Sequence, residues 1–137
     1  MRDLPSVINP EGWPQPKGYA NAVVAEGQIV VIAGQIGWNP VTNRLVSDDF
    51  VGQARQALAN VVTVLKAAGG KIEHLVRMTW YITDPDVYRA NLKEIGRAYR
   101  DEIGRYYPAM SVVVVAGLLE PGARVEIEAT AVIHGDP

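Results

Sequence analysis

With 137 residues and a hydrophobic share of 48%, the chain has the size and composition of one ordinary globular domain. The mean hydropathy of +0.02 and the 20% of charged residues exclude disorder and fibrous repeats for the whole chain. A net charge of -2 disfavours nucleic-acid binding, which normally needs a basic excess. With no cysteine and two separate histidines, the sequence excludes disulfides and disfavours a metal site.

Elements of the first half are predicted from turn residues and hydrophobic spacing. Residues 1–18 hold four prolines and two glycines, which predicts an extended arm. Residues 19–25 and 28–33 are rich in strand-forming residues, and the pair Glu26 and Gly27 between them predicts a hairpin. A loop rich in turn residues follows. Apolar residues then recur every three or four positions, which predicts a helix capped by Ser47 or Asp48 and ended by Gly69.

The second half predicts one more helix and three strands. Residues 72–83 alternate as a strand, and Asp84 caps a helix that ends near Gly104 and carries Asn91 on its inner face. Residues 110–116 and 124–134 predict two last strands joined by a turn. The order ββαβαββ predicts an α+β fold: a mixed sheet with hairpins at both ends and two helices on one face, forming a single domain over residues 1–137.

The last strand indicates that the sheet has a second, functional side. Its alternation places Val125 and Ile127 on one face and Glu126 and Glu128 on the other. The apolar row must meet the helices. The opposite face would also carry part of the apolar run SVVVVAG, which predicts an oligomer that covers it.

Several residues are candidates for chemistry, each beside a plainer interpretation. Glu126 and Glu128 lie about 6 to 7 Å apart along the strand, so one could act as a general base, or both could be solvated. Tyr19 could orient a polar ligand or be an ordinary strand tyrosine. The glycines of AGQIG, residues 33–37, allow a ligand to approach the backbone or simply form a turn. Asn91 needs a hydrogen-bond partner on its apolar stripe.

Other polar and aromatic residues carry weaker signals. Trp38, Trp80 and Tyr81 are typical core or interface residues, and the two histidines are expected on the surface. Ser111 lacks the sequence context and the partner histidine of a nucleophile. Since no segment approaches the roughly 18 apolar residues of a membrane span, and the N-terminus lacks a secretory signal, the predicted location is cytoplasmic, with no membrane partner.

Three stretches together resemble the Rid proteins, reactive intermediate deaminases of the YjgF type that are also labelled L-PSP endoribonucleases. They are GYANAVVAEGQIVVIAGQIGWNP, DDFVGQARQALANVVTVLKAAGGKIEHLVRMTWYITD and YYPAMSVVVVAGLLEPGARVEIEATAV, and they cover about residues 18–134. The resemblance implies a chorismate-mutase-like fold of the bacillus type and a homotrimer with three clefts between subunits. In the deaminating branch, such clefts hydrolyse enamines or imines to a keto acid and ammonia without a metal or cofactor.

The same resemblance implies roles for individual residues. Glu126 corresponds to the glutamate that positions the attacking water, and Tyr19 to a cleft tyrosine. The matching substrate-binding positions are Ala33, Gly34, Asn91, Met110 and Val112. Met110 departs from the family pattern because an arginine usually holds the substrate carboxylate there, while Val112 replaces a cysteine and Ala33 a serine. Arg105 and Arg124 flank the same strands and could supply charge from another direction.

The departure at position 110 leaves three functions open. The first is a homotrimer that binds a small metabolite in its clefts and acts as an enamine or imine hydrolase. The second is a non-catalytic ligand-binding or chaperone-like trimer, which the missing arginine favours. RNA cleavage, implied only by the family label, is disfavoured by the acidic composition and the lack of a basic stripe.

Overall fold

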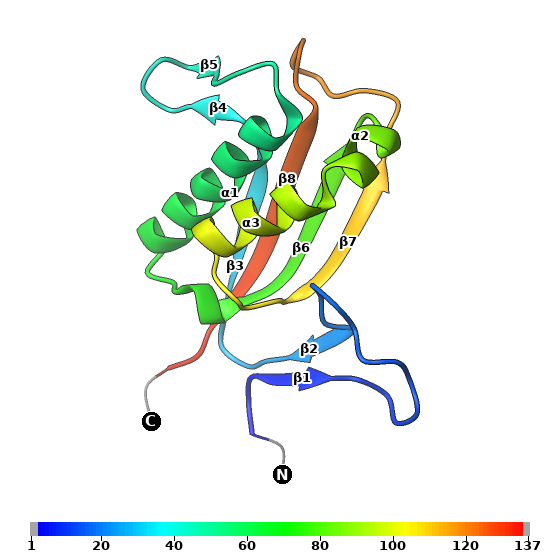
Figure 1. The fold of residues 1–137 in the computed structure, drawn as a ribbon. Coiled ribbons are helices and arrows are strands. Elements are labelled where there is room, and N and C mark those ends of the chain that lie inside the picture. The colour runs from blue at the N-terminus through cyan, green and yellow to red at the C-terminus, as the bar shows by residue number, and fades with distance from the viewer. Residues whose placement is uncertain (1–2, 136–137) are drawn as a thin grey trace.

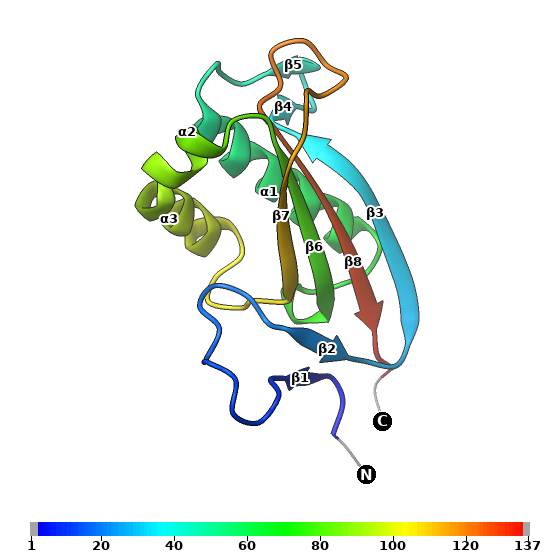
Figure 2. The same ribbon diagram turned by 90° about the vertical axis from the view of Figure 1, so that its right-hand side faces the viewer.

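A computed structural model describes residues 3–135 and shows a four-stranded mixed sheet in the order β3-β8-β6-β7 (Figure 1). The strands are β1 (Ser6–Ile8), β2 (Ala22–Val24), β3 (Gln28–Ile36), β4 (Trp38–Asn39), β5 (Arg44–Leu45), β6 (Leu75–Ile82), β7 (Ala109–Val114) and β8 (Val125–Ile133). The helices are α1 (Phe50–Ala67), α2 (Pro85–Ala90) and α3 (Leu92–Glu102), with a 3-10 turn at Ile72–His74. All three α-helices lie on one side of the sheet (Figure 2). The predicted α+β fold with helices on one face is confirmed.

The core lies between the helices and the inward rows of the central strands. Residues of α1 meet those of β3 and β8, and the core residues larger than alanine with no exposed surface are Leu58, Val61, Leu65, Leu75, Met78, Val125 and Ile127. The predicted apolar row of the last strand is therefore confirmed as the inner row. Burying each such side chain contributes roughly 1.5–3 kcal/mol to folding, which fixes the pairing register because a one-residue slip would expose the row.

Both predicted hairpins are wrong. Strand β2 pairs with β1, so the arm expected over residues 1–18 contains a short strand, and β3 pairs with β8 instead of β2. Strand β8 lies between β3 and β6, while β7 runs parallel to β6 at the sheet edge. Strands β8 and β6 are therefore the two central strands, each paired along both edges.

The predicted boundaries also shift in three places. Helix α1 is capped by Asp49, whose carboxylate accepts from the Gly52 amide at 2.8 Å, and not by Ser47 or Asp48. The expected loop contains the short hairpin of β4 and β5. The second predicted helix is two helices, α2 and α3, which meet at Asn91 with backbone angles outside the helical region.

Candidate functional site

The face of the sheet opposite the helices carries the polar residues of the central strands. We call it the open face. It consists, by strand register and alternation, of Ile29, Val31, Arg77, Thr79, Tyr81, Ser111, Val113, Glu126, Glu128 and Thr130. Ile29 and Val31 are 72% and 79% exposed in the single chain. Polar groups and uncovered apolar side chains thus share one surface, as a binding interface requires.

Glu126 lies against the backbone of the neighbouring strand. The β3–β8 register shifts between Ile32 and Gln35, and Gly34 sits in this irregular segment. A Cβ atom at Gly34 would collide with Oε2 of Glu126, so only glycine lets the strand pass this close to the carboxylate. Glu126 is half-buried, and no residue between 3 and 135 donates a hydrogen bond to its side chain. Its carboxylate is therefore positioned but available.

Glu128, the second carboxylate of the row, already has a partner. The hydroxyl of Tyr81 donates to Oε1 of Glu128 at 2.6 Å. This hydrogen bond, followed by burial, raises the pKa of Tyr81 above its usual value, while the positive charge of Arg77 opposes the rise. The two glutamates are therefore not equivalent: Glu128 accepts from a tyrosine, whereas Glu126 faces a glycine.

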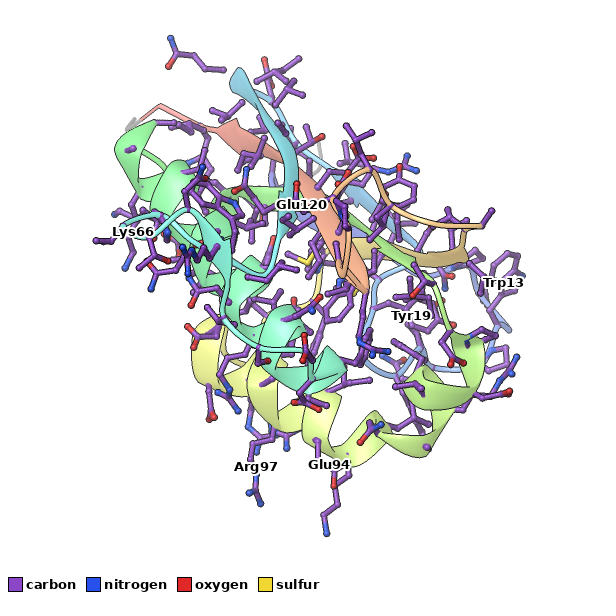
Figure 3. The ribbon with its side chains drawn as sticks, turned by 90° about the horizontal axis from the view of Figure 1, so that it is seen from above. Trp13, Tyr19, Lys66, Glu94, Arg97 and Glu120 are labelled. Carbon is purple, nitrogen blue, oxygen red and sulfur yellow. The ribbon has the colours of Figure 1, made fainter. Side chains whose placement is uncertain are left out.

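Tyr19 and Met110 line a second part of the surface, at the beginning of β7. The amide of Ala20 donates to the Pro108 carbonyl at 3.0 Å and holds the Tyr19 segment beside this strand. A hollow of about 300 Å³ opens here, lined by Tyr19, Ala20, Asn21, Arg77, Ala109, Met110 and Ser111. Tyr19 is on the opposite side of the molecule from Lys66 of α1 (Figure 3). Tyr19 and a cation, Arg77, thus border one hollow. Met110 is in register with the buried Met78, so its side chain belongs to the helix side and also borders a hollow with Trp80 and Tyr99.

A single chain does not join these two groups. Glu126 is in register with Tyr81, whereas the hollow begins at Arg77, which is in register with Ala109. Four residues of strand separate the two levels, which is roughly 13 Å. A small molecule held beside Tyr19 would therefore not reach Glu126 of the same chain.

The remaining predicted positions are placed in different surroundings. Asn91 is half-buried at the junction of α2 and α3, and its side-chain amide donates to the Val87 carbonyl at 2.8 Å. Val112 is in register with Trp80 and so shares the face that carries the helices, not the open face. Ala33 is exposed beside Gly34. The structure thus brings Gly34 to Glu126 and Tyr19 to the beginning of β7, while Asn91, Met110 and Val112 lie on the helix side.

Arg77 is the residue that the sequence analysis missed. Among the described residues that line the hollow, it is the one cation, whereas Arg105 and Arg124 do not line it. The strand sequence VRMTWYI held a signal, because Arg77, Thr79 and Tyr81 form the polar row of its alternation. What the sequence could not show was that the row faces the same side as Glu126.

Within residues 3–135, no group of three or more histidine, aspartate or glutamate side chains could hold a metal ion. In the same range, no helix is long and apolar enough to cross a membrane.

Comparison with known proteins places the chain in a family. The fold and the site define a mixed-sheet protein with an acidic residue on an uncovered face. The family model described as Endoribonuclease L-PSP matches residues 14–133. The chain belongs to this family, which includes the Rid proteins.

Relatives and solved structures agree with this assignment. A 2-iminobutanoate/2-iminopropanoate deaminase of Dermatophagoides farinae is 35% identical, covering 88% of this chain and 91% of the relative. The Rid family protein YyfB of Yersinia pestis superposes with a TM-score of 0.81 at 35% identity, covering 93% of this chain and 98% of that one. TdcF of E. coli, solved with bound serine, gives 0.69 at 34% identity, covering 94% and 99%. The predicted chorismate-mutase-like fold is confirmed.

Proposed function

We propose that this protein is a homotrimeric hydrolase that converts small 2-imino acids, or the enamines from which they form, to 2-keto acids and ammonia. The observation that carries the proposal is the carboxylate of Glu126, held against Gly34 and without a hydrogen-bond partner among the described residues. A relative at 35% identity is named for the deamination of 2-iminobutanoate and 2-iminopropanoate.

The proposed reaction needs few groups. Glu126 accepts a proton from water as the oxygen attacks the C=N carbon, then gives this proton to the nitrogen of the carbinolamine, whose C–N bond breaks to leave a ketone and ammonia. The oxygen of the water molecule becomes the ketone oxygen of the product, and the two hydrogens of the water molecule leave as part of ammonia. The imine nitrogen is protonated at the start, so a carboxylate beside the reacting carbon also stabilises the cation.

Two features support assembly of the cleft from more than one copy. The hollow beside Tyr19 and the carboxylate of Glu126 are about 13 Å apart along the strands of one chain, so a second copy must bring one group to the other. The exposed Ile29 and Val31 of the open face offer the apolar surface for such contact.

The activity is tested by generating 2-iminopropanoate in the presence of the protein and measuring ammonia release above the spontaneous rate. Glu126→Gln should lower the catalysed rate by roughly 10²–10⁴-fold, as loss of a general base does. Glu94→Gln is the matched control, because Glu94 is exposed on α3 and points away from the sheet (Figure 3). Equal rates for wild type and Glu126→Gln would refute the proposal.

The second candidate is a ligand-binding or chaperone-like trimer without catalysis, which Met110 at the position of the family arginine favours. Met110→Arg separates the two. If the wild type is inactive and this variant gains hydrolysis of 2-iminopropanoate, the site is intact except for its anchor. If the variant gains nothing, the cleft is remodelled beyond the loss of this anchor, which favours the second candidate.

Assembly is tested by light scattering, where a trimer has three times the 14.9 kDa mass of the chain. Val31→Asp places a charge on the apolar part of the open face and should shift the mass towards the monomer. Val41→Asp is the control, since Val41 is exposed in the loop between β4 and β5. A monomeric wild type would refute the cleft between copies.

A further inference from the structure

We propose that the side chain of the substrate enters a pocket at one end of the sheet, and that this pocket selects side chains that end in a cation such as a guanidinium group. The pocket, which we call the end pocket, has a volume of about 280 Å³ and is lined by Ile36, Trp38, Asn43, Leu45 and Glu120. The inference rests on the proposed function for the reacting part of the ligand, a 2-imino acid. It concerns selection of the side chain, so it can be tested by binding alone.

The end pocket begins beside Glu126. Ile36 of β3 is in register with Glu126 of β8, and residues opposite each other in antiparallel strands have Cβ atoms roughly 5 Å apart on the same face. Trp38 lies two residues further along the chain, at most about 7 Å beyond this level. A ligand whose C=N carbon is held at the Glu126 carboxylate can therefore place a side chain of three or four atoms in the end pocket.

The wall of the end pocket that carries Ile36 and Trp38 is fixed to helix α1. The side-chain amide of Asn60, a buried residue of α1, donates to the carbonyl oxygens of Trp38 at 2.9 Å and of Ile36 at 3.3 Å. A Cβ atom at Gly37 would collide with the backbone of α1, so the chain contacts the helix at Gly37 and the neighbouring side chains point away from it. This wall is therefore formed before a ligand binds.

The polar groups of the end pocket suit a cation. The indole nitrogen of Trp38 donates to Oε1 of Gln35 at 3.3 Å, so the ring offers its carbon atoms and its π system to the pocket. The exposed carboxylate of Glu120 is in no salt bridge within residues 3–135, and Asn43 adds an amide oxygen. An aromatic ring and a carboxylate together bind a guanidinium or ammonium group through cation–π contact and charge-assisted hydrogen bonds.

The charge of Glu120 is not neutralised by a neighbour in the end pocket. Among the described residues, Arg44 and Arg124 are close in sequence to members of the pocket, but neither lines it. Arg44 is in register with Asn39 and lines a separate hollow with it, on the other face of β5 from Leu45. An anionic side chain would be repelled here, and an aliphatic one would leave Glu120 without a partner, so a cationic side chain fits best.

The proposal is tested by calorimetric titration with arginine and citrulline. The two amino acids share the carboxylate, the amino group and the chain length, but a charged guanidinium in arginine is a neutral urea group in citrulline. Arginine should bind the wild type roughly threefold to thirtyfold more tightly than citrulline, and Glu120→Gln should bring the two affinities within about twofold of each other. Glu26→Gln is the matched control, because it removes an exposed carboxylate at the other end of β3 and should keep the preference.

Variants of Trp38 test the aromatic wall. Trp38→Phe keeps an aromatic ring and should retain most of the preference for arginine, whereas Trp38→Leu should reduce the preference to roughly a third. Equal affinities of the wild type for arginine and citrulline would overturn the proposal, as would a wild type that binds neither. A preference that Glu120→Gln leaves unchanged, or that Glu26→Gln lowers equally, would also overturn it, because the charge would then act from outside the end pocket.

The result is separable from the hydrolase proposal. If the wild type releases no ammonia from 2-iminopropanoate but prefers arginine in a way that depends on Glu120, the hydrolase proposal fails and the end pocket stands. If the wild type releases ammonia in a way that depends on Glu126, but Glu120→Gln leaves the preference for arginine unchanged, the hydrolase proposal stands and the end pocket fails.

Discussion

The two faces of β8 differ in what they contribute. On the helix side Val125, Ile127 and Ala131 have no exposed surface and pack against the core. On the open side Glu126 and Glu128 are half-buried and interact with neighbouring strands. One face of this nine-residue strand therefore packs in the core, and the other face carries the acidic side chains of the candidate site. Substitutions on the helix side should therefore lower the stability of the protein, whereas substitutions on the open side should leave it nearly unchanged, because successive side chains of the strand point to opposite faces.

The largest expected effect concerns stability on the helix side. Ile127→Ala should lower the free energy of unfolding by about 2–5 kcal/mol, because it leaves a cavity between the sheet and α1. Glu126→Gln, one residue away, should change it by less than about 0.5 kcal/mol, since it removes no packing. Urea denaturation followed by circular dichroism measures both. Similar losses in the two variants would contradict the division between faces.

The next effect concerns the fit of Gly34 against Glu126. Gly34→Ala adds a methyl group where the carboxylate lies, so one of the two must move, and the rate of ammonia release should fall by roughly tenfold to a hundredfold. Gly117→Ala makes the same chemical change where no atom lies within 4 Å. An equal decrease in both variants would show that the close approach is unimportant to the reaction.

A smaller effect concerns His74, which was expected on the surface but is 6% exposed, with its ring edge-to-face against His134. Its Nδ1 accepts from the Lys71 amide at 2.9 Å. Burial, and next the charge of His134, lowers the pKa of His74. The unfolded chain therefore binds more protons, and the free energy of unfolding falls as pH drops through about 6.5.

His74→Gln removes this titration, so its stability should change less between about pH 7.5 and about pH 5.5 than that of the wild type. Thermal unfolding at several pH values measures the difference. His134→Gln, at the exposed partner, should reduce the pH dependence only partly. Identical pH profiles for wild type and His74→Gln would show that His74 does not govern the acid response.

The smallest effect concerns the hydrogen bond between Tyr81 and Glu128 on the open face. The bond to the carboxylate is the main cause of the raised pKa of Tyr81, so Glu128→Gln should lower that pKa towards the usual tyrosine value. Ultraviolet titration, with Tyr81→Phe subtracted, isolates this group. A pKa that is unchanged in Glu128→Gln would mean that the hydrogen bond does not persist in solution.

The hydrophobic periods predicted element types well, because they reflect which side of each element is buried. The alternation of residues 124–134 and the spacing of α1 both depend on local sequence. Strand partners do not. Glu26 and Gly27 carry a hairpin signal, yet β2 pairs with β1 and β3 with β8, because pairing energy depends on distant strands that bury each other.

For the candidate site, too, local sequence predicted some features, whereas others depend on contacts between distant segments. Alternation in one strand placed Glu126 opposite the apolar row, and family resemblance pointed to Tyr19 and Gly34. Neither could show that Glu128 accepts a hydrogen bond from Tyr81 or that Arg77 and Tyr19 line one hollow, since these pairs of residues are more than thirty positions apart in the sequence.

The amino-acid sequence by itself determined α1, the strands of the four-stranded sheet and the buried row of the last strand, with its two glutamates on the other face, because these follow from the periodicity of a single segment. Tertiary structure decided the strand order, the hydrogen bond of Glu128 to Tyr81 and the place of Arg77 on the same face as Glu126. These depend on the register of β6 with β7 and β8, which is set by packing of the whole sheet against the helices.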